Sequence, residues 1–183
     1  MTTVFIGGSR RISHLAPQVE RRLDRIVEKK LLVLIGDANG ADKAVQRYLH
    51  SKHYENVEVF CTGEVCRNNV GNWKLRRVAS EASERNFDFY AAKDRLMSHQ
   101  ATVGLMIWDG KSVGTLLNVR RLLGKQKKVV VYDAPQARFW ELKAQSEWPS
   151  FVSSYDADLR DRVEQKALLE EPAQQPRQTS LLT

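Results

Sequence analysis

The chain has 183 residues, of which 42% are hydrophobic and 28% are charged, and its formal net charge is +7. This length and balance predict a globular domain with an ordinary core. The longest apolar runs are about six residues, far below the ~20 that a transmembrane helix needs, so no membrane partner is expected. The start of the chain does not resemble a signal peptide, and a cytoplasmic location is expected.

The basic excess suits an anionic partner, but its clusters are short and fall on predicted helix faces and ends. Lysine and arginine there also complement the helix dipole and favour solubility, so we expect a solvated surface rather than a nucleic-acid interface. The two cysteines, Cys61 and Cys66, are expected to be free thiols. They lack a second cysteine pair and a histidine at metal-ligand spacing, so no metal and no cofactor are predicted.

Apolar strands alternate with amphipathic segments along the chain. Strands are expected at 4–6, 31–35, 57–60, 102–107 and 128–132, and helices at 15–28, 41–49, 87–98 and 113–123. Residues 61–86 are the least periodic part, and the pattern predicts a long loop with one helical stretch near 73–84. Buried strands separated by amphipathic helices predict a Rossmann-like, doubly wound α/β fold, with a mostly parallel sheet and helices on both faces. Ligands of such folds bind outside the carboxyl ends of the strands.

The pattern changes after the fifth predicted strand. An aromatic segment at 135–148 is expected to pack back onto the sheet, and a last helix is expected from 153 to 171. Apolar residues recur in that helix at helical spacing, at Leu159, Val163 and Ala167. Packing of this stripe on its own domain is a simpler explanation than docking to a partner.

The most informative motif is a strand–turn–helix junction, Trp108-Asp109-Gly110-Lys111-Ser112-Val113-Gly114-Thr115. Such a junction presents free backbone N–H groups and the positive end of a helix dipole at the carboxyl edge of the sheet, where a phosphate is the usual guest. The candidate phosphate ligands are Gly110, Lys111, Ser112, Gly114 and Thr115. Trp108 is expected either to stack on a base or to belong to the core.

Two other strand ends combine glycine with polar residues: Gly7-Gly8-Ser9-Arg10, and Gly36-Asp37-Ala38-Asn39-Gly40-Ala41-Asp42. Glycine lets a ligand approach the backbone closely, and an arginine can pair with phosphate. Asp42 either stabilises the dipole of the following helix or binds ribose hydroxyls. Neither the dinucleotide fingerprint Gly-x-Gly-x-x-Gly nor a P-loop is present. The candidate ligand-binding residues in these turns are Gly7, Gly8, Ser9, Arg10, Gly36, Asp37, Gly40 and Asp42.

The order of these motifs resembles that of a known group of proteins. The two turns are followed by Lys93-Asp94-Arg95-Leu96-Met97 and then by the turn from Gly110 to Thr115. Over residues 4–132 the chain resembles the SLOG superfamily, and within it the YspA/YpsA-type branch. The resemblance implies binding of a nucleotide or a related phosphorylated ribose compound, with Lys93 and Arg95 among the binding residues.

The resemblance, together with the periodicity and composition of the C-terminal region, predicts the organisation of the chain. We expect a SLOG-like nucleotide-binding domain at 1–150, a C-terminal helix packed on it at 151–171, and a disordered tail at 172–183. Relatives form homodimers, so a homodimer is an expectation here.

The chain departs from the phosphoribohydrolases of this superfamily, which cleave an N-glycosidic bond. Asn118 stands where those enzymes carry a catalytic glutamate, and an amide cannot act as a general base. Lys93 stands where they carry an arginine, which keeps the charge but loses the planar fork. If this chain cleaves such a bond, another carboxylate must serve, and the catalytic candidates are Asp94 and Asp109.

The loop from Cys66 to Trp73 is long, polar and follows the third predicted strand. Because it emerges at the ligand edge of the sheet, we expect a lid or a base-recognising loop. Arg67 is expected to contact an anionic group, and Trp73 either stacks on a base or anchors the following segment in the core.

The sequence is compatible with three functions. The first is a nucleotide sensor or carrier, the second an N-glycosidic hydrolase or transferase acting on a nucleotide, and the third a single-stranded nucleic-acid binding module. The sequence lacks the alternating aromatic and basic groove residues of single-strand binders, so the third is the least favoured.

Overall fold

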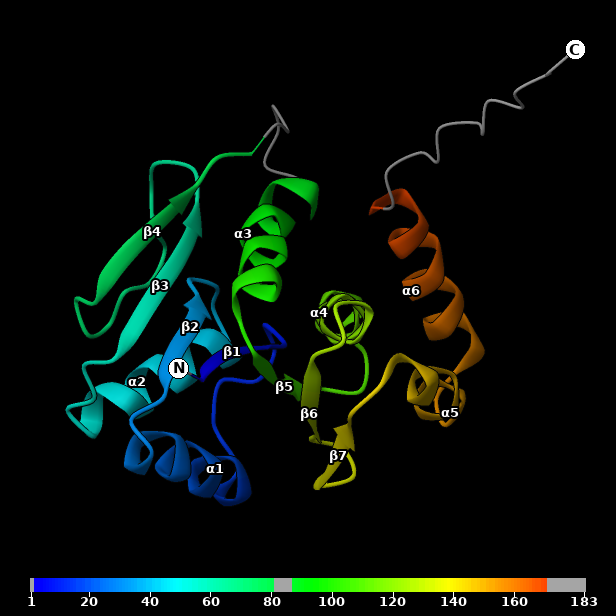
Figure 1. The fold of residues 1–183 in the computed structure, drawn as a ribbon, viewed down its shortest axis with the longest axis horizontal. Coiled ribbons are helices and arrows are strands. Elements are labelled where there is room, and N and C mark those ends of the chain that lie inside the picture. Colours follow the sequence, from blue (N-terminus) through cyan, green and yellow to red (C-terminus); the bar gives the residue numbers. More distant parts are fainter. Residues whose placement is uncertain (1, 81–86, 171–183) are drawn as a thin grey trace, which may run out of the picture.

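The computed structural model describes residues 2–80 and 87–170, and it shows a central sheet with helices on both faces (Figure 1). The elements, in chain order, are β1 (Thr3–Gly8), α1 (Pro17–Glu28), β2 (Leu32–Gly36), α2 (Ala41–Ser51), β3 (Val57–Thr62), β4 (Lys74–Val78), α3 (Phe87–Gln100), β5 (Val103–Trp108), α4 (Val113–Gly124), β6 (Lys128–Asp133), β7 (Arg138–Leu142), the 3-10 helix η1 (Gln145–Glu147), α5 (Trp148–Ser153) and α6 (Ala157–Glu170). None of the described helices is both long enough and apolar enough to cross a membrane. The tail expected at 172–183 lies outside the described residues.

The order of strands in the sheet creates a crevice between two of them. In the described part of the chain the seven strands are arranged β4-β3-β2-β1-β5-β6-β7, and every neighbouring pair is parallel except β6 and β7. This arrangement confirms the predicted doubly wound α/β fold. From β1 the chain adds β2, β3 and β4 on one side of the sheet, and then crosses back to add β5, β6 and β7 on the other side. The direction of strand order therefore reverses between the neighbouring strands β1 and β5. Ligands of open α/β sheets bind at such a switch point.

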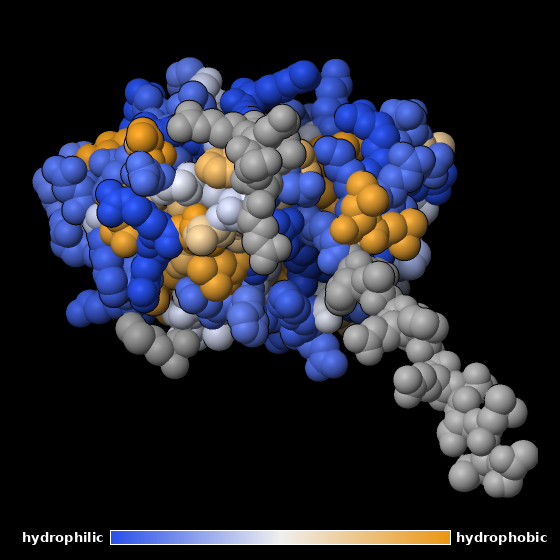
Figure 2. All heavy atoms as spheres, turned by 90° about the horizontal axis from the view of Figure 1, so that it is seen from above, coloured by the Kyte–Doolittle hydropathy of each residue, from blue (hydrophilic) through white to orange (hydrophobic). Residues whose placement is uncertain are grey.

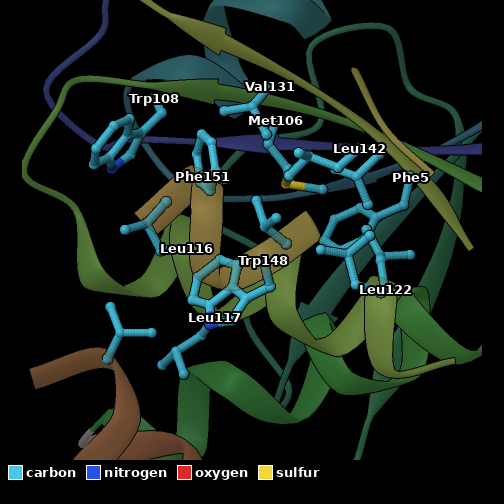
Figure 3. Close-up of a cluster of buried hydrophobic side chains, with 14 of the residues drawn as sticks. Phe5, Met106, Trp108, Leu116, Leu117, Leu122, Val131, Leu142, Trp148 and Phe151 are labelled. Carbon is cyan, nitrogen blue, oxygen red and sulfur yellow. The ribbon is translucent and has the colours of Figure 1, made fainter. Parts of the chain in front are cut away.

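The two faces of the sheet have separate apolar cores because alternate strand residues point to opposite sides. Val4 and Ile6 of β1 pack with α1 and α2. Phe5 packs on the other side, in a cluster to which α3, α4, α5 and α6 contribute. Figure 3 shows that cluster, with Trp108 and Phe151 close together.

Trp108 belongs to the core, which decides between the two roles left open for it. Its side chain is fully buried, and its indole Nε1 donates a hydrogen bond to the carbonyl of Ser112 at 3.1 Å. Its ring meets Tyr155 edge-on, with 4.6 Å between the ring centroids. Trp108 therefore anchors the β5–α4 turn to the core.

The helical stretch predicted near 73–84 is wrong in its described part. Residues 74–78 form β4, an edge strand that pairs with β3. Its Lys74, Arg76 and Arg77 are exposed, so the strand has no apolar periodicity to reveal it. Charged residues on an edge strand hinder pairing with other chains, which explains this composition. Residues 81–84 of the predicted stretch lie outside the described part.

The C-terminal region differs from the prediction in two places. Residues Arg138–Leu142 form β7, an antiparallel strand where the sequence indicated only aromatic packing. The last helix predicted over 153–171 is confirmed as α6, Ala157–Glu170, with its apolar stripe buried, but its predicted start is wrong, because α5 ends at Ser153 and α6 begins at Ala157. Asp156 accounts for the break: its Oδ1 accepts hydrogen bonds from the N–H groups of Asp158 and Leu159, at 2.8 and 3.4 Å.

Candidate functional site

A cavity of about 880 Å³ lies at the carboxyl ends of β1 and β5. Its walls come from the turn after β1, the start of α2, one side of α3, the β5–α4 turn and the start of α6. This volume falls within the range of ~300–1,000 Å³ that is usual for small-molecule sites. The crevice expected from the strand order is therefore a hollow of suitable size.

Most of the residues predicted from the sequence line this cavity. They are Gly7, Gly8, Ser9, Arg10, Asp42, Lys93, Asp94, Asp109, Gly110, Lys111, Ser112, Gly114 and Thr115. The predicted residues that do not line it are Gly36, Asp37, Gly40, Arg95 and Trp108.

The backbone of Ser9 joins the three predicted turns. Its N–H donates to the carbonyl of Ile107 at 2.9 Å, and its carbonyl accepts from the N–H of Ala41 at 3.0 Å. Gly40 makes this approach possible, because it has φ +84° and a Cβ there would lie 2.4 Å from the backbone of Arg10. Gly40 thus allows the close approach of the two turns, although it does not line the cavity itself.

The β5–α4 turn satisfies part of its own hydrogen-bonding capacity. Asp109 Oδ1 accepts from the N–H groups of Lys111 and Ser112, at 3.0 and 2.8 Å, and Ser112 Oγ accepts from the N–H of Thr115 at 3.4 Å. Burial opposes ionisation of Asp109, but hydrogen bonds from Ser9 and from these N–H groups hold its pKa below the ordinary value. A negative charge thus already faces the turn, and it weakens the field that an incoming anion would meet.

Two N–H groups of the turn remain available. Those of Val113 and Gly114, in the first turn of α4, have no hydrogen-bond partner among the described residues. Both residues line the cavity. They are the donors at this helix N-terminus that a bound anion can use.

Basic side chains without a carboxylate partner lie around the same turns. Arg10, Arg11 and Lys111 line the cavity and are exposed, and none forms an ion pair within the described part of the chain. The guanidinium of Arg10 lies 5.3 Å from the ring centroid of Tyr90. These three cations can therefore turn toward a ligand without breaking an existing ion pair.

A cluster of buried charges lies on the α2 and α3 sides of the cavity. Lys93 Nζ is 2.8 Å from Asp94 Oδ1, and Asn118 Nδ2 donates to Asp94 Oδ2 at 3.1 Å. Although burial disfavours its charged form, Lys93 and Arg121 keep the pKa of Asp94 below the ordinary value. With lowered pKa values, Asp94 and Asp109 are ionised at neutral pH, and neither is suited to act as a general acid.

Asp42 has the opposite behaviour. Burial raises its pKa to about 6, although the charge of Lys93 acts against this. Gly36 makes room for these two side chains, because a Cβ at Gly36 would lie 2.4 Å from Asp42 Oδ2 and 2.6 Å from Lys93 Nζ. Among the cavity carboxylates with perturbed pKa values, Asp42 is the one that exchanges a proton closest to neutrality.

The raised pKa makes the stability of the protein depend on pH. Because the pKa rises from 3.8 to about 6 on folding, the folded state gains stability from the Asp42 proton below about pH 4 and loses it as the pH rises to 6. We expect the Asp42→Asn variant to be more stable than the wild type at pH 8, by about 3 kcal/mol. Urea unfolding at pH 4 and pH 8 measures this, and an equal difference at both pH values would contradict the expectation.

The predicted residues outside the cavity have partners of their own. Asp37, which is 2% exposed, forms an ion pair with Arg67, whose NH2 lies 2.6 Å from Asp37 Oδ1. Arg95 lies on the exposed side of α3 and pairs with Glu170 of α6 at 3.3 Å. A residue that belongs to one of the predicted motifs therefore does not always have its side chain at the cavity.

The loop from Cys66 to Trp73 is tied to the body of the protein rather than to the cavity. Arg67 contacts an anionic group, as expected, but that group is Asp37. Asn68 Nδ2 donates to the carbonyl of Asp37 at 2.8 Å, and Trp73, which is buried, donates from Nε1 to the carbonyl of Tyr54 at 2.8 Å. Trp73 is therefore a core residue, and no residue of this loop lines the cavity.

Several residues that line the cavity had no signal in the sequence. Phe87 and Tyr90 of α3, Arg121 of α4, and Asp156 and Arg162 from the region of α6 lie on its walls. These residues are brought to the cavity by the packing of helices that are distant in sequence. No local motif predicts this packing. Cys61 is buried and Cys66 half-buried, neither is in a disulfide, and the described residues contain no cluster that could hold a metal ion.

The fold and the cavity define a Rossmann-like α/β protein with a candidate ligand site at the switch point of its sheet. The chain matches no protein-family model and no curated protein. Among solved structures, its fold is similar to DNA processing protein A from Helicobacter pylori, described for its single-stranded DNA binding mode. The TM-score is 0.54 at 15% sequence identity, over 90% of this chain and 80% of that chain. This likeness concerns the fold.

Proposed function

We propose that this chain binds a nucleotide or a related phosphorylated ribose compound in the cavity, as a sensor or carrier. The observation that carries the proposal is a set of three basic side chains, Arg10, Arg11 and Lys111, that have no carboxylate partner among the described residues and lie beside the N–H groups of Val113 and Gly114. They surround the switch point of the sheet, where phosphate groups bind in folds of this kind.

The side chains contribute more to anion binding than the helix end does. A helix dipole near the surface contributes about 0.3–1 kcal/mol, and Asp109 offsets part of it here. A hydrogen bond to a charged group contributes about 1.5–3 kcal/mol, so two or three such bonds give an affinity that calorimetry can measure. Binding should therefore depend chiefly on Arg10, Arg11 and Lys111.

We expect Arg10→Ala and Lys111→Ala each to weaken the binding of adenosine monophosphate about tenfold, because each removes a charge-assisted hydrogen bond. Isothermal titration calorimetry on the full chain measures this. Arg25→Ala is the matched control, since it makes the same change in net charge at an exposed position on α1 outside the cavity. Equal affinities for all three variants would contradict the proposal.

A second candidate is binding of single-stranded nucleic acid. It is favoured by the fold similarity to a protein described for that property and by the net charge of +7. An oligothymidylate that bound by many phosphate contacts would lose affinity steeply with salt, whereas a mononucleotide with few contacts would lose little.

A different experiment separates binding from N-glycosidic cleavage. After incubation of the protein with a nucleotide, chromatography would detect the free base if the bond were cleaved, and intact nucleotide if it were only bound.

A further inference from the structure

The walls of the cavity differ in character from one end to the other. Figure 2 shows a mostly hydrophilic surface in which apolar side chains form separate areas. The exposed large hydrophobic residues are Val65, Phe87, Leu168 and Leu169, and of these Phe87 alone lines the cavity among the described residues. We propose that the ligand is a mononucleotide whose aromatic base packs on Phe87, with the base end toward the start of α6. This inference rests on the proposed function and specifies its ligand.

Phe87 lies between the phosphate turn and the C-terminal helix. A Cβ built on Gly114 would be 3.8 Å from Phe87 Cε2, so the ring is next to the free N–H groups of α4. From α6, Lys166 Nζ lies 3.7 Å from the ring centroid. The side chain is still 37% exposed, which leaves part of the ring for a ligand. The ring is therefore within reach of a base whose phosphate is held near Gly114.

The other aromatic ring at the cavity is already in use. Tyr90 has the guanidinium of Arg67 at 4.5 Å and that of Arg10 at 5.3 Å from its ring centroid. Cations over an aromatic face compete with a base for the same surface. Phe87 has one such cation, Lys166 at 3.7 Å, whereas Tyr90 has two, and 37% of Phe87 is exposed. Phe87 therefore keeps more of its ring for stacking, which is tolerant of base identity because every base has a π-face.

The charges of the walls limit the length of the ligand. Arg10, Arg11 and Lys111 make one end basic, whereas the α6 end carries Asp156 and an ion pair between Asp158 and Arg162 at 3.6 Å. A mononucleotide has the matching polarity, because its phosphate is anionic and its base carries neutral hydrogen-bond donors. A strand that continued past the base would bring a second phosphate toward Asp156, which has no ion-pair partner among the described residues and would repel it.

Calorimetry with adenosine monophosphate and ribose 5-phosphate on the full chain tests the contact with the base. We expect adenosine monophosphate to bind at least tenfold more tightly than ribose 5-phosphate. Phe87→Ala should remove about tenfold of this preference and leave the affinity for ribose 5-phosphate unchanged. Phe87→Leu, which keeps apolar bulk without an aromatic ring, should resemble Phe87→Ala if stacking is responsible, and Leu169→Ala, at an exposed apolar residue outside the cavity, should change nothing.

A second arm tests the acidic end. The dinucleotide pApA should bind more weakly than adenosine monophosphate, and Asp156→Asn with Asp158→Asn should reduce that difference several-fold. Equal affinities for ribose 5-phosphate and adenosine monophosphate, unaffected by Phe87→Ala, would overturn this inference while the proposed function stood. Absence of binding of every phosphate compound would instead overturn the proposed function.

Discussion

The Gly114→Val variant is expected to lose the binding of nucleoside monophosphates by about a hundredfold or more while it keeps its fold. A Cβ at Gly114 would meet only Phe87 Cε2, at 3.8 Å, so the protein itself tolerates a side chain there. The branched side chain would nevertheless stand in front of the free N–H group of its own residue and exclude the phosphate. Because an excluded phosphate also loses its contacts with the basic side chains, at least two charge-assisted hydrogen bonds are lost, and at about 1.5–3 kcal/mol each they give the expected magnitude.

The same helix offers a matched control. Gly124 is the last residue of α4, and a Cβ there would meet nothing within 4 Å. Gly124→Val therefore makes the same chemical change, in the same helix, outside the cavity. Calorimetry should show wild-type affinity for Gly124→Val, and circular dichroism should show both variants folded. Wild-type affinity in Gly114→Val would contradict the assignment of this turn to the phosphate.

Much of the cavity could be predicted from the sequence because of a topological rule. Glycine and polar residues follow β1, β2 and β5, and the carboxyl ends of parallel strands meet at one edge of a sheet. The position of the turns thus followed from the apolar runs alone. The side chains within them did not, because neighbouring residues of a turn or helix point to different sides. Lys93 is buried at the cavity, whereas Arg95, two residues later, is exposed and pairs with Glu170.

The elements that the sequence missed lack apolar periodicity or depend on distant contacts. β4 exposes Lys74, Arg76 and Arg77 at the edge of the sheet, so it resembles a loop in sequence. The α6 side of the cavity depends on how α6 packs against α4, where Arg121 donates from Nε to Glu170 Oε2 at 2.8 Å. Such a contact joins residues far apart in the chain, and a pattern within either helix does not predict it.

Arg67→Ala is expected to lower the free energy of unfolding by about 2–3 kcal/mol, less than the ~3–5 kcal/mol for a fully buried ion pair, because Asp37 is buried but Arg67 is partly exposed. Asp37 is 2% exposed, and it accepts from Arg67 through Nε at 3.0 Å, NH2 at 2.6 Å and the backbone N–H at 3.0 Å. The variant keeps the backbone bond and loses both bonds from the guanidinium. A carboxylate then remains buried with its main counter-charge gone, and urea unfolding measures the loss.

Two comparisons and one pH series separate this explanation from a general effect of losing an arginine. Arg76→Ala removes an exposed arginine paired with Glu58 and should cost less than about 1 kcal/mol. Adding Asp37→Asn to Arg67→Ala should restore part of the stability, since no buried charge is left without a partner. Burial opposes ionisation of Asp37, but its hydrogen bonds with Arg67 hold its pKa below 3.8. The stability that this ion pair contributes is therefore present above about pH 4 and is lost as the pH falls below that value. The loss of stability in Arg67→Ala should accordingly be full at pH 7 and smaller in acid. A loss that is the same at neutral and acidic pH would place its origin in packing rather than in the ion pair.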